Sequence, residues 1–232
     1  MVSVRSVLSA FAVVASLGAC EPSSSFRPAA LPPLVAAAKP KPVAAAARLQ
    51  LAAGESWIWD VQLQGMSIGR AELVVGDHEV HSRFATSKLA SAFATVHADD
   101  VTTFDRATAQ PTATRDVLDV DGDHDAKDTA LAGTNRHSIH TAIGWLRAWA
   151  TPDAAASTLV VEYLGKPYTL EVARPVPELV DDKHALRIDG VVRGAPKPVA
   201  LTIWLSADDK HAPLRIAITT DNIHVTAQLI DS

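Results

Sequence analysis

The eight residues WIWDVQLQ, at positions 57–64, alternate between large apolar and polar side chains. One face carries Trp57, Trp59, Val61 and Leu63. A period of two residues is typical of a β-strand with one buried face, because successive side chains of a strand point to opposite sides. Two indoles on the buried face predict an interior that holds large side chains. The segment therefore commits the chain to a sheet with one apolar face.

Further short segments of strand character follow, separated by clusters of Gly, Pro and Asp. Two of them, STLVVEYL and YTLEVA, flank Gly165-Lys166-Pro167, and Asp121-Gly122 is a hairpin turn signal between two others. Close spacing and hairpin turns favour antiparallel pairing. We count about ten strands, which predicts a mainly β fold: a curved antiparallel sheet or a partly closed β-barrel.

Two segments have helical character. Residues 137–149 carry an apolar stripe at helical spacing and predict the one long helix. The stripe consists of Ile139, Ile143, Leu146 and Trp149. Ser87 is a suitable N-cap for a short helix over 88–96, in which Leu89 and Phe93 stand four residues apart on one face. The expected fold thus has one long and one short helix.

The first 20 residues have the organisation of a bacterial lipoprotein signal. Arg5 provides a positive start, and the apolar run at 7–17 is too short to span a bilayer, which takes about 20 apolar residues. The run ends in Leu17-Gly18-Ala19-Cys20, which resembles a lipobox. Cys20 is the only cysteine, and an unpaired thiol in an exported protein otherwise needs an explanation. We expect acylation of Cys20; the alternative is an ordinary cleaved signal with a leftover cysteine.

These features divide the chain into a signal peptide at 1–19, the lipidated Cys20 with a Pro/Ala-rich tether over 20–50, and a single β-rich domain over 51–232. We expect an exported protein, anchored in the membrane through Cys20. Glu21 follows the cysteine where inner-membrane retention favours Asp, so the periplasmic side of the outer membrane is the expected location. The net charge of −5 and the absence of a basic patch argue against nucleic acid as a partner.

Three passages, in this order, resemble a family of exported bacterial proteins described as domain of unknown function 3108. At 54–75 the chain opens with Gly-Glu and contains a Gly-x-x-x-Gly bend, and at 101–122 an aromatic residue and Asp105 precede a proline and a strand. The third passage, 201–231, matches at Trp204, Leu205, Asp209, Pro213 and Leu214. The helix ending in Trp145-Leu146-Arg147 stands where the family has a helix with an arginine. The resemblance implies a mostly antiparallel β fold in the cell envelope, and no known reaction, cofactor or catalytic residue.

The segment GMSIG, at 65–69, matches the Gly-x-Ser-x-Gly pattern of serine hydrolases. A nucleophile elbow needs a helix directly after the serine, whereas residues 73–75 favour a strand. We therefore interpret Gly65 and Gly69 as bend or bulge positions and do not assign Ser67 as a nucleophile. The chain is predicted to be non-enzymatic and to have no cofactor; a hydrolase or a metal-dependent enzyme is the remote alternative.

Two groups of side chains are candidate metal ligands. They are Asp119, Asp121 and Asp123 in one segment and His137 and His140 in the next. The aspartates match the first three positions of an EF-hand loop, but His124 and Ala130 stand where that loop needs Gly and Glu. A solvated hairpin tip is the competing interpretation. The two histidines are three residues apart on the predicted helix, within reach of one metal ion.

The five tryptophans are candidates for a ligand-binding surface. They are Trp57, Trp59, Trp145, Trp149 and Trp204. Indoles fill protein cores, and they also line the apolar pockets that hold small molecules, so both interpretations stay open. We expect a hydrophobic ligand in the concave face of the sheet. A structural or assembly module that contacts other envelope proteins is the alternative.

Overall fold

The computed structural model describes residues 49–107, 110–221 and 223–232. The predicted signal peptide, Cys20 and nearly all of the tether lie outside these residues. Within them the chain forms strands β1 (Ser56–Leu63), β2 (Met66–Val75), β3 (Glu79–Thr86), β4 (Val96–Asp105), β5 (Gln110–Val120), β6 (Asp123–Ala130), β7 (Arg136–His137), β8 (Ser157–Tyr163), β9 (Lys166–Val172), β10 (Val176–Val180), β11 (Lys183–Arg193), β12 (Val199–Ser206), β13 (Pro213–Thr220) and β14 (Ile223–Asp231). The helices are η1 (Ala90–Ala92), a single 3₁₀ turn, and α2 (Ile139–Trp149).

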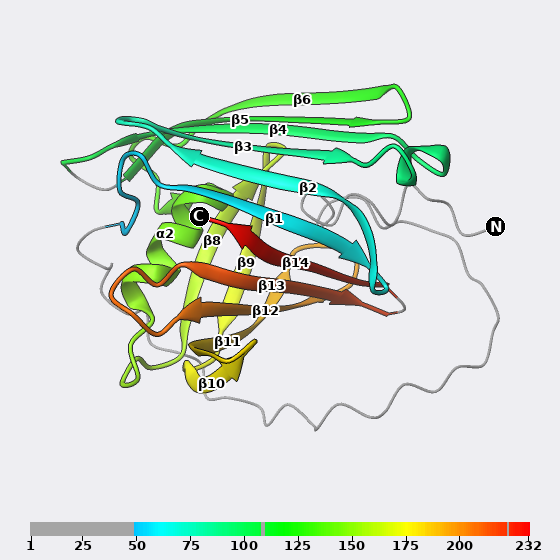
Figure 1. Ribbon diagram of the computed structural model, residues 1–232. Coiled ribbons are helices and arrows are strands. Elements are labelled where there is room, and N and C mark those ends of the chain that lie inside the picture. The colour runs from blue at the N-terminus through cyan, green and yellow to red at the C-terminus, as the bar shows by residue number, and fades with distance from the viewer. Residues whose placement is uncertain (1–48, 108–109, 222) are drawn as a thin grey trace.

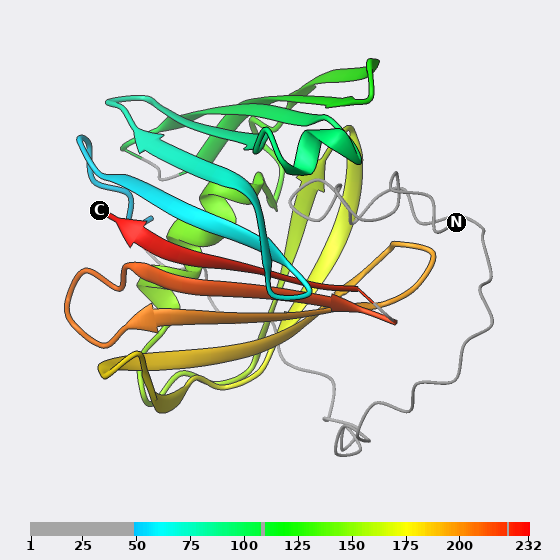
Figure 2. The same ribbon diagram turned by 45° about the vertical axis from the view of Figure 1, so that its right-hand side comes forward.

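All of these strands belong to one sheet, in the order β6-β5-β4-β3-β2-β1-β14-β13-β12-β11-β9-β8-β7, with β10 paired to β11 off this path. Neighbouring strands are antiparallel except β7 and β8, which are parallel. The sheet curves around α2, which lies on its concave side (Figure 1 and Figure 2). The prediction of a mainly β, curved antiparallel sheet is therefore confirmed.

Two details of the predicted fold are wrong. The described residues form 14 strands and not about ten, and the sheet is not closed into a barrel, since β6 and β7 remain its two ends. The two ends nevertheless approach each other, where β5 contacts β7 and at the β8–β9 turn. There the backbone N–H of Leu164, in the β8–β9 turn, donates to the carboxylate of Asp116 on β5 at 2.9 Å. A side-chain contact takes the place of the strand pairing that would complete a barrel.

The long helix begins two residues later than the sequence predicted, because Ser138 caps it. The Ser138 hydroxyl accepts the backbone N–H of Thr141 at 3.2 Å, and the Thr141 hydroxyl accepts the backbone N–H of Ser138 at 2.9 Å. This reciprocal arrangement satisfies two N–H groups that the first helical turn leaves free. The middle of α2 packs against Leu51, which lies so close to Gly144 that a Cβ there would stand 2.7 Å from the leucine Cγ.

The short helix predicted over 88–96 is reduced to η1. Leu89 and Phe93 do not turn inward but are 78% and 77% exposed. Ala94, only 2% exposed, occupies the inward position instead. Only one tight turn forms between β3 and β4, with its large side chains outside.

The main core lies between α2 and the concave face. The predicted alternation of the first strand is confirmed, since Trp57, Trp59 and Val61 are all at most 3% exposed. Leu49, at the end of the predicted tether, also packs against this core. The main chain of Gln50 is bound to α2, because its N–H donates to the carbonyl of Gly144 at 3.1 Å. The folded part thus includes the last residues before Leu51.

Candidate ligand-binding site

An apolar cavity of about 130 Å³ lies between α2 and the concave face of the sheet. The helix contributes Ile139, Ala142, Ile143 and Leu146, which is most of its predicted apolar stripe. Strands β8, β9, β11, β12 and β13 contribute the opposite wall, with Ile203 and Ile216 as cross-strand neighbours in its centre. Apart from the hydroxyls of two tyrosines the lining side chains are hydrocarbon, so the cavity suits an apolar group.

One side of the cavity is less covered than the other. The half-buried lining residues are Ile139, Ile143, Val161, Val192, Leu201 and Ile218. Leu201 and Ile218 are paired near the start of β12 and the end of β13, and Val192 is next to the last residue of β11. The cavity therefore opens toward the end of the sheet that carries the β11–β12 and β13–β14 connections. We call this end the open end.

The wall beside β3, β4 and β5 is polar and buried. His140, 2% exposed, reaches from α2 to this wall. Its Nδ1 lies 2.8 Å from the Thr102 hydroxyl, and its Nε2 lies 2.8 Å from the Ser82 hydroxyl. Burial lowers the pKa of His140 to about 3, with a smaller contribution from the neighbouring His81. The ring is therefore neutral, and it ties the start of α2 to two strands.

Two carboxyl groups stand opposite each other in this wall. Asp100 on β4 and Asp116 on β5 are register partners and are 9% and 3% exposed. Burial, reinforced by the charge of Asp116, raises the pKa of Asp100 to about 8. Burial also raises the pKa of Asp116, although the Thr114 hydroxyl donates to it at 2.9 Å. Asp100 is consequently protonated at neutral pH.

Tyr163 connects the polar wall with the cavity. Its ring lines the cavity, and its hydroxyl, among the described residues, has no hydrogen-bond partner. Burial raises the pKa of Tyr163, and the carboxyl groups of Asp100 and Asp116 raise it further once they are ionised. The phenol therefore stays protonated and separates the apolar cavity from the two carboxyl groups.

None of the five tryptophans lines this cavity. Trp57 and Trp59 pack against each other in the core with ring centroids 6.1 Å apart, and the Trp59 indole N–H donates to the carbonyl of Pro213 at 2.9 Å. Trp145 and Trp149 stack on α2 at 5.4 Å. These four indoles are core residues.

Trp204 lies on the outer face of the sheet. It alternates with the cavity residue Ile203 along β12, and the guanidinium of Arg215 lies 5.7 Å from its ring centroid. The outer cluster that it joins consists of Val180, Ala185, Leu214 and Leu229. Trp204 thus covers the convex face and is remote from the concave site.

The candidate metal ligands have other partners. Asp119 pairs with His124 at 2.6 Å, and Asp121 accepts the backbone N–H of Thr95 at 2.8 Å. Asp121 and Gly122 have φ values of 52° and 86°, which confirms the predicted hairpin turn. Asp123 begins β6 directly after this turn.

The two histidines do not form a joint site. Both ring nitrogens of His140 are hydrogen-bonded to hydroxyls, and burial lowers the pKa of His137. The part of the chain that the structure describes contains no group of three or more His, Cys, Asp and Glu side chains placed to hold a metal ion.

The GMSIG segment is a hairpin and the start of a strand. Gln64 and Gly65 form the turn with φ values of 52° and 83°, and the Ser67 hydroxyl donates to the carboxylate of Asp60 on the neighbouring strand. A Cβ at Gly69 would lie 2.3 Å from the carbonyl oxygen of Ala85. The two glycines therefore serve a turn and a close approach of strands, and Ser67 does not stand at a strand-to-helix turn.

The strand walls of the cavity were not predicted as a site. Their signal was present in the sequence, because Val199, Leu201 and Ile203 alternate along β12 and face the stripe of the predicted helix. The prediction favoured the tryptophans, whereas the cavity is lined mainly by aliphatic side chains. Large rings fill space more readily than they leave it open.

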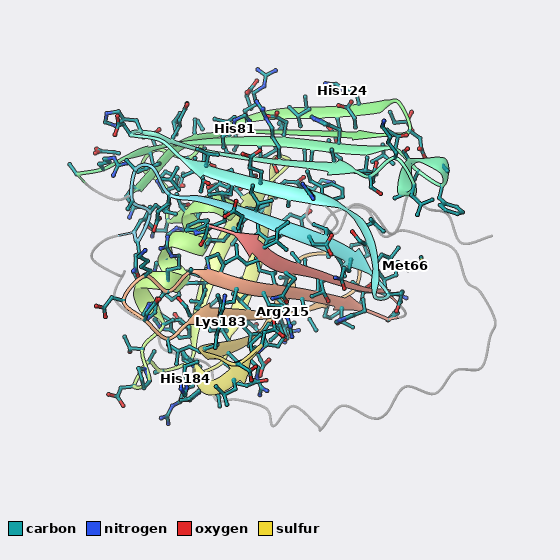
Figure 3. All side chains as sticks on the ribbon, viewed as in Figure 1. Met66, His81, His124, Lys183, His184 and Arg215 are labelled. Carbon is teal, nitrogen blue, oxygen red and sulfur yellow. The ribbon has the colours of Figure 1, made fainter. Side chains whose placement is uncertain are left out.

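A second hollow of about 500 Å³ lies beside β10, with Pro177, Leu179 and His184 among its lining residues. Figure 3 labels His184 at this end of the molecule. The lining mixes apolar side chains with Glu178 and two histidines. It lacks the uniformly apolar wall of the cavity under α2.

The similarity of this chain to known proteins is weak. No protein-family model and no curated protein matches the chain. Among solved structures, the crystal structure of the Mycobacterium tuberculosis lipoprotein LppX is similar, with 12% sequence identity over 75% of this chain and 84% of that chain and a TM-score of 0.28. A likeness at that TM-score carries no argument about function. Membership in the family of unknown function 3108 stays a prediction.

In the described residues no helix has the length and apolar character to cross a membrane.

Proposed function

We propose that this protein is a non-enzymatic lipoprotein of the cell envelope that binds a hydrophobic ligand in the concave face of its sheet. The observation that carries the proposal is the apolar cavity between α2 and strands β8 to β13. Folded proteins usually fill such space with side chains, so a void lined by hydrocarbon and open on one side is typical of a binding site.

The size of the cavity limits what enters it. At about 130 Å³ it is similar to the cavities of ~150 Å³ that hold a benzene-sized molecule. It is smaller than the ~300–1,000 Å³ that a whole drug-sized ligand occupies. The expected ligand is therefore a chain or ring of which one hydrocarbon segment enters the cavity, while the rest lies along the half-buried residues of the open end.

The anchoring part of the proposal rests on the sequence. The pattern Leu17-Gly18-Ala19-Cys20 after an apolar run supports acylation of Cys20. Two acyl chains are enough for stable membrane attachment. The protein would then hold its cavity close to a source of lipid, on the periplasmic side of the outer membrane.

Ligand binding is tested with the chain that begins at residue 20 and carries Cys20→Ser, incubated with lipid extracted from its own envelope. Native mass spectrometry is expected to show a retained lipid, and an apolar fluorophore is expected to bind in competition with it. Leu201→Trp, at the cavity, should reduce fluorophore binding about tenfold, an effect of ~1.4 kcal/mol. Ala200→Trp is the matched control, because Ala200 is the exposed neighbour on the outer face of β12.

A cavity that excludes every lipid and fluorophore in the unsubstituted chain would overturn the proposal. Equal binding by the Leu201 and Ala200 variants would place the ligand elsewhere on the protein. Both variants are first compared by circular dichroism, so that a loss of fold is not mistaken for a loss of binding.

A further inference from the structure

Three large apolar side chains project into solvent at the open end of the sheet. Leu89 is 78% exposed, Phe93 is 77% exposed and Met66 is 67% exposed. These are the highest exposures among the large hydrophobic side chains of the described residues. We refer to these three residues as the apolar tip.

The loop that carries Leu89 and Phe93 is held in place by its own hydrogen bonds. The backbone N–H of Ser91 donates to the carbonyl of Ser87 at 2.8 Å, and that of Phe93 donates to the carbonyl of Ala90 at 2.9 Å. The backbone N–H of Thr95 donates to the carboxylate of Asp121 at 2.8 Å. Because the turn is tied down on both sides, the exposure of its two large side chains is built into the fold.

The apolar tip and the mouth of the cavity lie at the same end of the strands. The backbone N–H of Ser87 donates to the carbonyl of Ile68, two residues from Met66, at 2.8 Å. The β1–β2 turn in turn meets the β13–β14 turn, where Gln64 N–H donates to the carbonyl of His224 at 2.9 Å. Figure 1 shows η1 and these turns together at the right-hand end, and Figure 3 labels Met66 there.

We propose that the apolar tip inserts into the surface of a phospholipid bilayer, so that the mouth of the cavity faces the lipid from which its ligand comes. The proposal deepens the proposed function and rests on it for the ligand. Contact with the bilayer itself is independent of ligand binding and is measured separately.

The chain outside the structure is long enough for this orientation. Residue 49 lies at the opposite end of the sheet, where Gln50 binds α2 and Gly54 N–H donates to the carbonyl of Val75. The ten residues of β2, from Met66 to Val75, span about 33 Å between the two ends. The 28 residues at 21–48 reach up to about 95 Å when extended. A chain anchored at Cys20 can therefore present either end of the domain to the membrane.

The charge around the tip favours insertion of apolar side chains over electrostatic attraction. The segment 87–95 contains one basic residue, Lys88, and it is bound to the acidic turn at Asp121. Basic clusters are what draw proteins to anionic lipid. A bilayer of zwitterionic phospholipid is thus the fitting partner. The lipid anchor would raise the effective concentration of that surface further.

The test is flotation of the chain from residue 20 with Cys20→Ser on phosphatidylcholine–phosphatidylethanolamine vesicles. This chain lacks the acyl group but keeps all described residues. Without any further substitution, this chain is expected to float with the vesicles at low and at high salt. Leu89→Ser with Phe93→Ser should lower the partition coefficient about tenfold or more. Val176→Ser with Leu179→Ser is the matched control, since these residues are 45% and 61% exposed on β10, away from the tip.

Failure of the unsubstituted chain to float would overturn the inference, and would leave a protein partner as the occupant of the tip. Equal losses in the tip and control variants would also overturn it, because the contact would then be unspecific. A requirement for phosphatidylglycerol, abolished by salt, would show electrostatic binding and contradict the apolar mechanism. If the chain retains a lipid in native mass spectrometry but does not float, this inference fails while the proposed function stands.

Discussion

Arg147 and Glu55 form a bidentate ion pair at the end of the sheet opposite the open end. The guanidinium Nη1 and Nη2 donate to the two carboxylate oxygens at 2.9 and 2.7 Å. Arg147 is only 1% exposed, its Nη2 also donates to the carbonyl of Lys210, and its guanidinium lies 4.6 Å from the ring centroid of Trp57. One buried side chain thus joins the helix, the first strand and the β12–β13 loop.

Removal of Arg147 is predicted to destabilise the protein strongly. Arg147→Ala leaves the Glu55 carboxylate and several carbonyls without their donor, and breaking a buried pair costs ~3–5 kcal/mol. Urea unfolding measures the free energy of unfolding. Arg193→Ala, which breaks the exposed pair with Glu171, is the control and should change stability very little. Similar losses of stability for both variants would show that Arg147 does not hold the helix, the first strand and the β12–β13 loop together.

The same pair predicts a loss of stability in acid. Burial alone raises the pKa of Glu55, but hydrogen bonds from Arg147 and from the backbone of Ala52 outweigh it and bring the pKa below its ordinary value. A depressed pKa contributes stability that is present above the unfolded value, about 4.3, and is lost as the pH falls through the folded value. Glu55→Gln should flatten the dependence of unfolding free energy on pH below about 4.5. If Glu55→Gln left the pH dependence of the unfolding free energy in acid unchanged, Glu55 would not be its source.

Asp100 predicts the opposite behaviour at higher pH. Its folded pKa of about 8 lies above its unfolded value, so its stabilising contribution is complete below about pH 4 and is lost as the pH rises toward 8. Asp100→Asn is therefore expected to raise the free energy of unfolding at pH 8 by ~1–3 kcal/mol. Thermal unfolding at pH 5 and pH 8 measures this gain, which should be larger at pH 8.

Its neighbour Asp99 is the matched control for this experiment. Asp99 faces the other side of β4 and pairs with His81 at 2.7 Å and Arg83 at 3.1 Å. Burial raises its pKa, but these two partners outweigh burial and the net pKa is lowered. Asp99→Asn should thus lower stability slightly at both pH values. A gain from Asp99→Asn equal to that from Asp100→Asn would contradict the burial argument.

The two residues that suggested a nucleophile elbow should differ in their effect on stability. Gly69→Ala places a Cβ 2.3 Å from the Ala85 carbonyl and should cost ~1–3 kcal/mol or more, because the strands must separate. Ser67→Ala removes one exposed hydrogen bond to Asp60 and should cost less than ~1 kcal/mol. Chemical denaturation of the two variants measures both changes in the free energy of unfolding. A larger loss from Ser67→Ala would require a role for its hydroxyl that the structure does not provide.

Acylation of Cys20 is open to a direct test in the native host. Cys20→Ser should abolish labelling by radioactive palmitate and should move the protein from the membrane fraction to the soluble or unprocessed fraction. Globomycin, which inhibits processing of lipoproteins, should cause accumulation of the unprocessed form of the unsubstituted chain. Unchanged membrane attachment of the Cys20→Ser chain would show that the anchor lies elsewhere.

Alternation and capping made part of this structure predictable. The first strand and the helix over Ile139–Trp149 have strong local patterns, and both occur within two residues of their predicted positions. The short helix failed because Leu89 and Phe93 have the spacing of a buried stripe but no surface to pack against. The strands β7 and β10, of two and five residues, are held by pairing with neighbours and leave little pattern of their own.

The candidate site was predicted in kind but not in its residues. Alternating strands predict a concave apolar surface. The position of a cavity on that surface depends on where the side chains of α2 and of the strands leave space between them. The inward-facing Asp100 and Asp116 could not be anticipated, because acidic residues in a strand pattern are expected on its exposed face. The β8–β9 turn, through Leu164, and α2, through His140, cover this surface in the folded structure.

The pairing of β1 with β14 has a consequence for biogenesis. The first strand, Ser56–Leu63, sits in the middle of the sheet between β2 and the last strand, Ile223–Asp231. Contacts so distant along the chain form slowly, because a long loop must close first. The centre of the sheet is thus completed only after the residues of β14 have been synthesised, and a chain cut short before β14 leaves both β1 and β13 with an unpaired edge. A single late closure of the sheet, after β14 has been synthesised, is the order of events that this topology imposes.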